Sequence, residues 1–208
     1  MWATVVDRTG MVGAVAFSGE EAGDQWPGSR IISAQKANTA NGLSLDSFAL
    51  SSANLYAAAQ PGGSLYGIDV SNPVNAEVVY GGHPRDNGTE RDHMVGRAPG
   101  GVNVFGGGLP LYAADGKIVG GLGCSGDYSC GDHNIAWKVR HALELDYVPG
   151  GVDPVVVPGK PKDDNIIFDI DESTGKSASG WGHPACPGRT KDVGLALPKS
   201  YPVRAGAK

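Results

Sequence analysis

A glycine-rich segment, residues 106–126, contains the residues of this chain best suited to contact a ligand. Its glycines at 120, 121, 123 and 126 remove side chains where another backbone or a ligand must come close. The run Gly106-Gly107-Gly108 could present backbone N–H groups to an anion, although a tight start of a strand is the simpler account. Asp132 follows shortly afterwards and could cap a helix. The segment therefore indicates either a ligand cleft or a closely packed backbone.

Motifs of common enzyme classes are missing. No glycine pattern of a dinucleotide-binding fold and no P-loop lysine is present. Ser125 does not lie in a GxSxG elbow. Asp132 and His133 are adjacent, so on a helix their side chains diverge by about 100° and make a poor dyad. The acidic pairs at 163–164 and 169/171 lack the EF-hand pattern, so hydrolase, nucleotide and calcium chemistry are all disfavoured.

Composition narrows the class of protein further. The 208 residues suit one domain with an appendage, and 33 glycines with 14 prolines favour turns over long helices. The net charge is −5 and no block of Lys and Arg stands out, which disfavours nucleic acid as a partner. No apolar run of about 18 residues is present, so we expect no membrane span.

The three cysteines fit no metal or haem-attachment motif. Cys124 lies in an apolar strand and should pack as a small hydrophobic residue. Cys130 and Cys186 are the better pair for a disulfide, and the alternative is three free thiols in a reducing cytosol. Such a disulfide would favour a periplasmic or secreted protein if a leader precedes Met1, and a cytoplasmic one is expected otherwise.

Hydrophobic patterning predicts the order of the elements. We expect a hairpin of two strands at 2–7 and 11–18, followed by helices at about 27–41 and about 45–60 and a long polar excursion at 68–100. A strand at 102–105 should lead into a second hairpin at 109–123 and a helix at about 132–145, and the tail should add one strand at 165–170. Trp137 falls on the side of the last helix away from its apolar stripe, which predicts cover by another subunit or by the tail.

Several short motifs, in order, resemble one known family. They are Val5-Val6-Asp7-Arg8-Thr9-Gly10, the run Ser33 to Ala40, Gln60-Pro61-Gly62, Leu65-Tyr66-Gly67-Ile68, Gly107 to Leu111, Asp115-Gly116, Val119 to Gly123, Ser125-Gly126 and Asp132. Together they are similar to the GlcG/HbpS family of haem-binding proteins, which includes the C-terminal domain of PduO. The similarity covers about residues 4–145.

The resemblance implies a fold and a domain organisation. It implies an α/β (α+β) protein with a profilin-like or PAS-like antiparallel sheet of about five strands, flanked by helices and assembled into homo-oligomers. Residues 1–147 would form the GlcG/HbpS-like domain with a long insertion at about 68–100, and residues 148–208 an irregular extension. The N-terminal helix of the family is expected to be missing, and with it the axial histidine that this helix carries in the PduO branch.

The resemblance also implies haem as the ligand, which needs an axial ligand, an apolar slot and cations for its propionates. His133 lies beside the glycine-rich junction and is the first candidate for the axial ligand, with His93 in the long loop as the second. Arg30 and Lys36 are the best partners for carboxylates, with Gly106, Gly107, Gly108 and Asp132 around the site. In each case a packed or solvated side chain is the alternative.

The expected function is therefore a haem or tetrapyrrole binding protein, in storage or sensing and without an assigned reaction. Two alternatives stay open. One is an enzyme or accessory protein acting on a small hydroxy acid or diol, which would use Lys36, Arg30 and Asp132. The other is an oligomeric assembly or signalling module without a small ligand.

Overall fold

Four antiparallel strands form one sheet in the order β2-β1-β4-β3, and the computed structural model describes residues 1–152 and 163–205. The strands are β1 (Trp2–Asp7), β2 (Val12–Phe17), β3 (Gly108–Tyr112) and β4 (Ile118–Ser125). The first and last strand pairs are hairpins, and β1 joins them by pairing with β4 along its whole length. The chain is thus an α+β protein whose sheet joins two local hairpins through one pairing of distant strands, β1 with β4.

Both hairpin turns form where the sequence predicts them. Gly10 closes the first turn with a φ of 84°, and Gly116 closes the second with a φ of 77°. In the second turn the Gly116 N–H donates to the carbonyl of Ala113 over 2.9 Å. Positive φ is accessible to glycine at little cost, so the two turns follow directly from the sequence.

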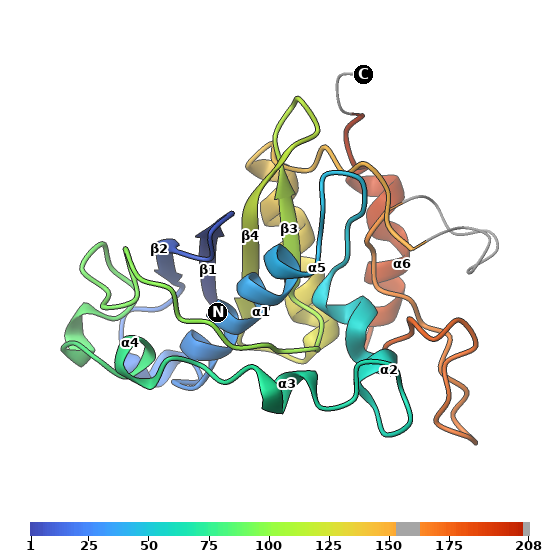
Figure 1. Cartoon of the computed structure of the whole chain (residues 1–208), viewed down its shortest axis with the longest axis horizontal. Coiled ribbons are helices and arrows are strands. Elements are labelled where there is room, and N and C mark those ends of the chain that lie inside the picture. Colours follow the sequence, from blue (N-terminus) through green and yellow to red (C-terminus); the bar gives the residue numbers. More distant parts are fainter. Residues whose placement is uncertain (153–162, 206–208) are drawn as a thin grey trace.

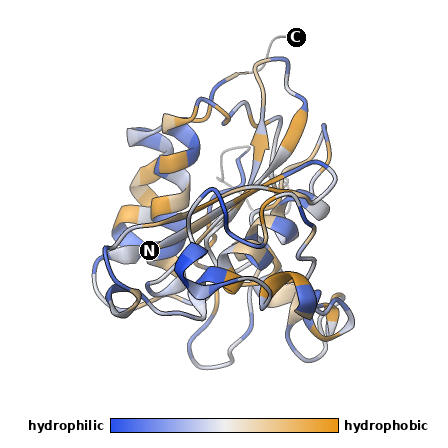
Figure 2. Ribbon diagram, turned by 90° about the vertical axis from the view of Figure 1, so that its left-hand side faces the viewer, coloured by the Kyte–Doolittle hydropathy of each residue, from blue (hydrophilic) through white to orange (hydrophobic). Residues whose placement is uncertain are grey.

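Helices cover both faces of the sheet (Figure 1). The first main helix, α1 (Ser29–Gly42), crosses one face, and α5 (Ser129–Ala142) lies on the other with α6 (Thr190–Ser200) packed against it. The shorter helices are η1 (Ala22–Asp24), η2 (Ser52–Leu55), α2 (Tyr56–Ala59), α3 (Ile68–Ser71), α4 (Ala76–Val79) and η3 (Pro84–Asp86). The helices carry both apolar and polar residues along their length, as expected when only one side faces the sheet (Figure 2). Within the described residues, no helix is long and apolar enough to cross a membrane.

Helix α1 packs with its backbone directly against the sheet. A Cβ atom on Gly108, Gly121 or Gly123 would overlap a carbonyl oxygen of α1, contributed by Lys36, Ala37 and Ser33 respectively. Small side chains on α1, such as Ala34 and Ala37, complete the contact and are fully buried. The glycines of the second hairpin are therefore needed for close approach of two backbones, which is one of the two roles their pattern predicts.

The opposite face of the sheet carries the larger apolar side chains. Leu122 and Cys124 of β4 pack with Trp137 of α5 and Leu197 of α6 in one buried cluster. Trp137 is 1% exposed, and its indole N–H donates to the carbonyl of Tyr201 over 2.9 Å. Of the two covers predicted for this tryptophan, the C-terminal tail is the one present. Burial raises the pKa of the Cys124 thiol to about 12, consistent with a packing role.

The expected sheet of about five strands is wrong in number, because residues 102–105 form no strand. Their backbone groups bond to side chains instead. Asn103 N–H donates to the Thr39 hydroxyl over 2.9 Å, and the Ser52 hydroxyl donates to the carbonyl of Phe105. The segment thereby runs beside α1 without a strand partner.

The helix expected at about 45–60 is also shorter than predicted. Residues Leu45 and Phe48 exchange backbone hydrogen bonds in a turn, and the Ser44 hydroxyl binds Leu50. Helical structure starts only after Ser51, which forms a capping box with Asn54. Of the excursion at 68–100, only the short elements α3, α4 and η3 are helical.

The C-terminal segment crosses the domain and is held at several points. A disulfide joins Cys186 to Cys130 in the first turn of α5, with 5.9 Å between their Cα atoms. Arg140 of α5 forms a fully buried bidentate ion pair with Asp164, with nitrogen–oxygen distances of 2.6 and 2.8 Å. Residues 165–170 form no regular strand, contrary to expectation, and side chains take the backbone groups of Asn165. Its N–H donates to the carboxylate of Asp163 over 2.9 Å, and its carbonyl accepts from the Asn54 amide over 3.0 Å.

Replacement of a sheet glycine tests the close approach of α1. Gly123→Ala places a methyl group on the carbonyl of Ser33, so we expect a loss of about 3 kcal/mol or more in the free energy of unfolding. Gly42→Ala is the matched control, because its Cβ meets nothing within 4 Å and alanine favours the helix end. Urea denaturation of both variants measures the difference, and equal stability of the two would contradict the packing described above.

Candidate functional site

A cavity of about 560 Å³ opens between the first half of α1, residues 103–105 and the junction of β4 with α5. We call it the junction cavity. The side chains that shape it are Trp26, Ile32, Lys36, Phe105, Tyr128 and Asp132. Its volume lies in the range of small-molecule sites. The opening thus lies beside the glycine-rich segment from which the sequence predicts a ligand cleft.

A buried ion pair forms one polar end of the junction cavity. Lys36 Nζ lies 2.7 Å from a carboxylate oxygen of Asp132 and donates to the carbonyl of Cys124 over 3.2 Å. The second oxygen of Asp132 accepts the Asp127 N–H over 2.9 Å. Helix α5 begins at Ser129 rather than at Asp132, so Asp132 reaches back from the first turn to bind the chain that precedes the helix.

Burial moves the pKa values of this pair toward each other. Desolvation lowers the pKa of Lys36, against the opposing effect of the Asp132 charge. Desolvation also raises the pKa of Asp132, against the opposing effect of Lys36. A proton is therefore shared more easily between these two groups than between a lysine and an aspartate in water.

Three exposed aromatic side chains line part of the junction cavity with apolar surface. Trp26, Phe105 and Tyr128 are 72%, 45% and 60% exposed, in a chain with few aromatic residues. Exposed large aromatics at one opening are typical of a surface that binds something apolar. Sequence analysis missed all three, although each stands just before a glycine run or the start of a helix.

The glycine run does not act as an anion nest. The Gly106 N–H donates to His183 Nε2 over 3.3 Å, and the Gly108 N–H donates to the Ser52 hydroxyl over 2.8 Å. A Cβ on Gly107, whose φ is 120°, would overlap the carbonyl of Cys124. The run is thus required for internal packing behind the cavity, and the simpler of its two interpretations holds.

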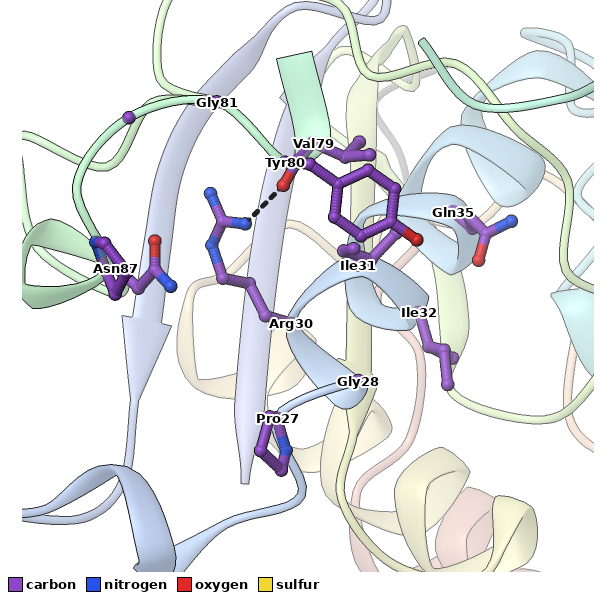
Figure 3. Close-up of a pocket in the computed structure, with 12 residues that line it drawn as sticks. Pro27, Gly28, Arg30, Ile31, Ile32, Gln35, Val79, Tyr80, Gly81 and Asn87 are labelled. Carbon is purple, nitrogen blue, oxygen red and sulfur yellow. Dashed lines mark hydrogen bonds between the residues drawn. The ribbon is translucent and has the colours of Figure 1, made fainter. Parts of the chain in front are cut away.

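Arg30 and Lys36 do not converge on one site. The Arg30 guanidinium pairs with the carboxylate of Asp92, with 2.8 Å between Nε and Oδ2, and Nη1 donates to the carbonyl of Val79 over 2.7 Å. Figure 3 shows Arg30 in a second cavity, of about 470 Å³, which Tyr80 also lines. Arg30 and Lys36, the two candidate partners for carboxylates, therefore lie at different cavities in this structure.

Neither histidine proposed as an axial ligand stands at the junction cavity. His133 is fully buried between α5 and the C-terminal segment, with Nε2 3.2 Å from the side-chain oxygen of Asn165. His93 is half-buried in the long excursion against Gly81 and Gly82. Within the described part of the chain, the group of three side chains able to hold a metal ion contains neither of them.

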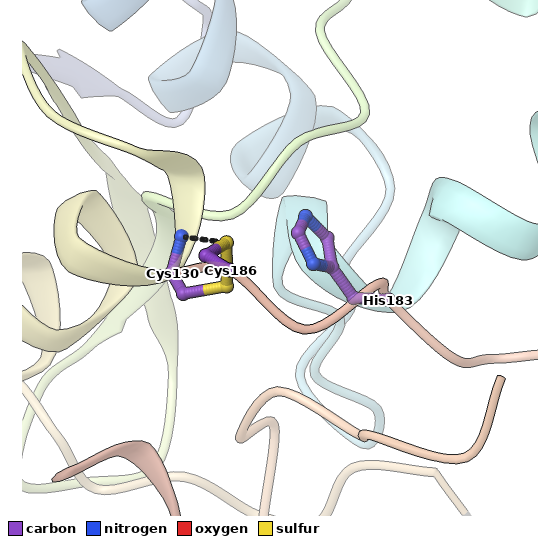
Figure 4. Close-up of side chains that lie close together, drawn as sticks. All are labelled: Cys130, His183 and Cys186. Carbon is purple, nitrogen blue, oxygen red and sulfur yellow. Dashed lines mark hydrogen bonds between the residues drawn. A yellow bond between two sulfur atoms is a disulfide. The ribbon is translucent and has the colours of Figure 1, made fainter. Parts of the chain in front are cut away.

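That group consists of Cys130, His183 and Cys186, whose potential ligand atoms lie within 4.8 Å of one another (Figure 4). His183 is fully buried, and its Nδ1 donates to the carbonyl of Pro184 over 2.8 Å. It also lines a third cavity, of about 640 Å³, together with Tyr56 and other residues. Sequence analysis paired the two cysteines but did not place His183 with them, because Cys130 lies 56 residues before Cys186 and the three residues fit no metal motif.

The comparisons with known proteins agree with the sequence resemblance. The family of HbpS-like proteins, described as "haem degrading protein HbpS-like", matches residues 1–140. This chain belongs to that family, since the match covers well over half of its length. No curated protein is similar enough in sequence to count as a match.

Three chains among the solved structures match this one, and two of them are as follows. One is PduOC in complex with haem, which is 24% identical with a TM-score of 0.45, over 68% of this chain and 76% of that one. The other is the Klebsiella pneumoniae protein ORFY of the DUF336 family, which is 25% identical with a TM-score of 0.41, over 65% and 68%.

Removal of one charge tests the ion pair of the junction cavity. Asp132→Asn leaves the Lys36 ammonium buried without a counter-charge, so we expect a loss of about 3–5 kcal/mol in the free energy of unfolding. The double variant Lys36→Met with Asp132→Asn should recover much of the loss. Asp46→Asn, at the exposed pair with Lys117, is the control and should lower the free energy of unfolding far less, because solvent screens this pair. A single variant as stable as this control would refute the role of the pair, as chemical denaturation would reveal.

The buried His183 predicts a pH dependence of stability. Burial lowers its pKa from 6.5 to about 4, so between these pH values the unfolded chain binds a proton that the folded chain does not. The contribution of the neutral His183 to the free energy of unfolding is fully present above about pH 6.5. It is lost as the pH falls to about 4, by about 3 kcal/mol in total. His183→Gln should lack this component. Denaturation of both proteins at pH 7 and pH 4 measures it, and parallel losses would contradict the assignment.

Proposed function

We propose that this protein binds haem or a related tetrapyrrole in the junction cavity and that it serves in haem storage or sensing. Membership of the HbpS-like family supports the ligand class. One structural observation carries the location: Trp26, Phe105 and Tyr128 together line a cavity of suitable volume. A flat apolar ring gains most from aromatic walls, because stacking adds to the burial of apolar area.

The lining residues fit the porphyrin ring better than they fit its iron and propionates. Among the described residues that line this cavity, Tyr128 is the one of a type that proteins use as an axial haem ligand. Lys36 is the one cation within the same described lining, and Asp132 already neutralises it. We therefore propose that Tyr128 would hold the iron of a bound haem and that Trp26 and Phe105 would hold its ring. Bound haem would supply a redox-active iron centre to the protein.

An enzyme acting on a small hydroxy acid or diol is the second candidate. One observation favours it: Lys36 and Asp132 lie at the same cavity, with pKa values that burial moves toward each other. Such a pair could give and take a proton from a bound hydroxyl group. Arg30 would take no part, since it is held by Asp92. Turnover or a thermal shift with a panel of hydroxy acids and diols would favour this candidate over haem binding.

Haem titration with matched aromatic variants tests the proposal. We expect a Soret shift that saturates near one haem per chain, and a roughly tenfold weaker affinity in Trp26→Ala because one stacking wall is lost. Tyr128→Phe should change the Soret position while the wall remains. Tyr80→Ala is the control, because Tyr80 is equally exposed but lines the cavity of Arg30.

The outcomes separate the alternatives clearly. Equal weakening by Trp26→Ala and Tyr80→Ala would place haem elsewhere on the chain. A flat titration of the folded protein would remove the proposal. Homo-oligomerisation stays a prediction, which the mass of the protein with and without haem would test.

A further inference from the structure

The cluster of Cys130, His183 and Cys186 takes no part in the proposed haem site. Its three potential ligand atoms lie within 4.8 Å of one another, although they come from α5 and from the C-terminal segment. Figure 4 shows the imidazole of His183 on the same side of the segment as the two sulfur atoms. Two cysteines and one histidine are a ligand set typical of zinc.

A hydrogen bond to the backbone fixes the tautomer of the His183 imidazole. Its Nδ1 lies 2.8 Å from the carbonyl of Pro184, which can only accept, so Nδ1 carries the proton. The lone pair is therefore on Nε2, where it accepts only a long hydrogen bond of 3.3 Å from the Gly106 N–H. Metal-binding histidines are commonly fixed by such a bond from the other ring nitrogen to a backbone carbonyl.

The surroundings of the two sulfur atoms favour thiolates once the disulfide is open. The Cys130 N–H donates to Cys186 Sγ over 3.2 Å, and the Ser129 hydroxyl lies 3.7 Å from the same sulfur. Cys130 is the second residue of α5, a helix of 14 residues, where the helix dipole stabilises negative charge. Cys186 is half-buried, so a reductant can reach it.

The cluster is compact enough to close around a zinc ion once the disulfide opens and the two sulfur atoms separate. Two Zn–S bonds of about 2.3 Å at a tetrahedral angle place the sulfurs about 3.8 Å apart, and a Zn–N bond of about 2.0 Å places nitrogen about 3.5 Å from each. These spacings lie within the 4.8 Å that the ligand atoms now span. Two thiolates also balance the charge of the ion, which a half-buried site requires.

We propose that Cys130, Cys186 and His183 form a redox-gated zinc site, closed as a disulfide when oxidised and open to a thiophilic divalent ion when reduced. A dithiol reductant supplies two electrons and two protons, becomes a disulfide itself, and converts the Cys130–Cys186 bond to two thiols. Zn²⁺ then displaces the two thiol protons to solvent and takes Nε2 of His183 as its third ligand, in place of the Gly106 hydrogen bond. The fourth position is left to water from the cavity that His183 and Pro184 line.

The test compares the same full-length protein in two redox states. Protein reduced with dithiothreitol and desalted without oxygen is titrated with Zn²⁺ against a chromophoric chelator, and the untreated disulfide form is titrated in parallel. We expect one Zn²⁺ per reduced chain and none per oxidised chain. With Co²⁺ in place of Zn²⁺, the reduced protein should show the d–d bands of a tetrahedral centre and a thiolate-to-cobalt charge-transfer band.

Variants separate this site from unspecific thiol binding. His183→Gln should weaken Zn²⁺ binding by at least about tenfold while both thiols remain. Cys186→Ser should abolish binding. Cys124→Ala is the matched control, because it removes the third, buried cysteine and should leave the affinity unchanged.

Three results would overturn the proposal. They are equal affinity of His183→Gln and the unmodified sequence, Zn²⁺ uptake by the oxidised protein, and loss of the native fold on reduction, as tryptophan fluorescence and circular dichroism would show. None of these measurements uses haem, so the proposals of a zinc site and of a haem site are tested independently.

Discussion

The contact of the α1 backbone with the sheet is the constraint on which the rest of the structure depends. Glycines at 108, 121 and 123 leave no side chain between the strands and the carbonyls of Ser33, Lys36 and Ala37. Such close approach positions Lys36 beside the end of β4, where its Nζ reaches both the carbonyl of Cys124 and the carboxylate of Asp132. A wider spacing would put the ammonium out of reach of both, so the ion pair at the junction cavity is a consequence of the glycine pattern.

The same constraint separates the polar and apolar parts of the junction cavity. Lys36 and Asp132 are almost fully buried, so their charges act on a ligand mainly through the cavity and hardly through solvent. The three aromatic side chains that line the cavity come from segments that precede a helix or the glycine run, and all three are exposed. A ligand with a broad apolar body suits this arrangement better than a small anion, because the one cation is already neutralised.

Local features of the sequence predicted local structure well. Both hairpins, α1 and the approximate position of α5 follow from turn glycines, small residues and apolar periodicity. Residues 102–105 have the composition of a strand, but Thr39 and Ser52 take their backbone groups, and this competition is visible only in three dimensions. Arg30 failed as a ligand partner for the same reason, since Asp92 lies 62 positions away in sequence. Pairings between distant side chains decide which charged residues stay available, and no spacing rule reports them.

Helix α5 brings the two proposed sites close together without merging them. Cys130 and Asp132 are two positions apart in its first turn, so their side chains diverge by about 200° and face different neighbours. Opening the disulfide would free the segment around Cys186, but the rest of the tail has its own attachments: Arg140 holds Asp164, and Trp137 donates to the carbonyl of Tyr201. The tail residues of these two contacts, 164 and 201, lie before and after Cys186 in the sequence. Reduction of the disulfide therefore frees the segment around Cys186 and not the whole tail. A local release of this kind gives His183 and Cys186 the freedom to close around an ion while α5 keeps Asp132 on Lys36.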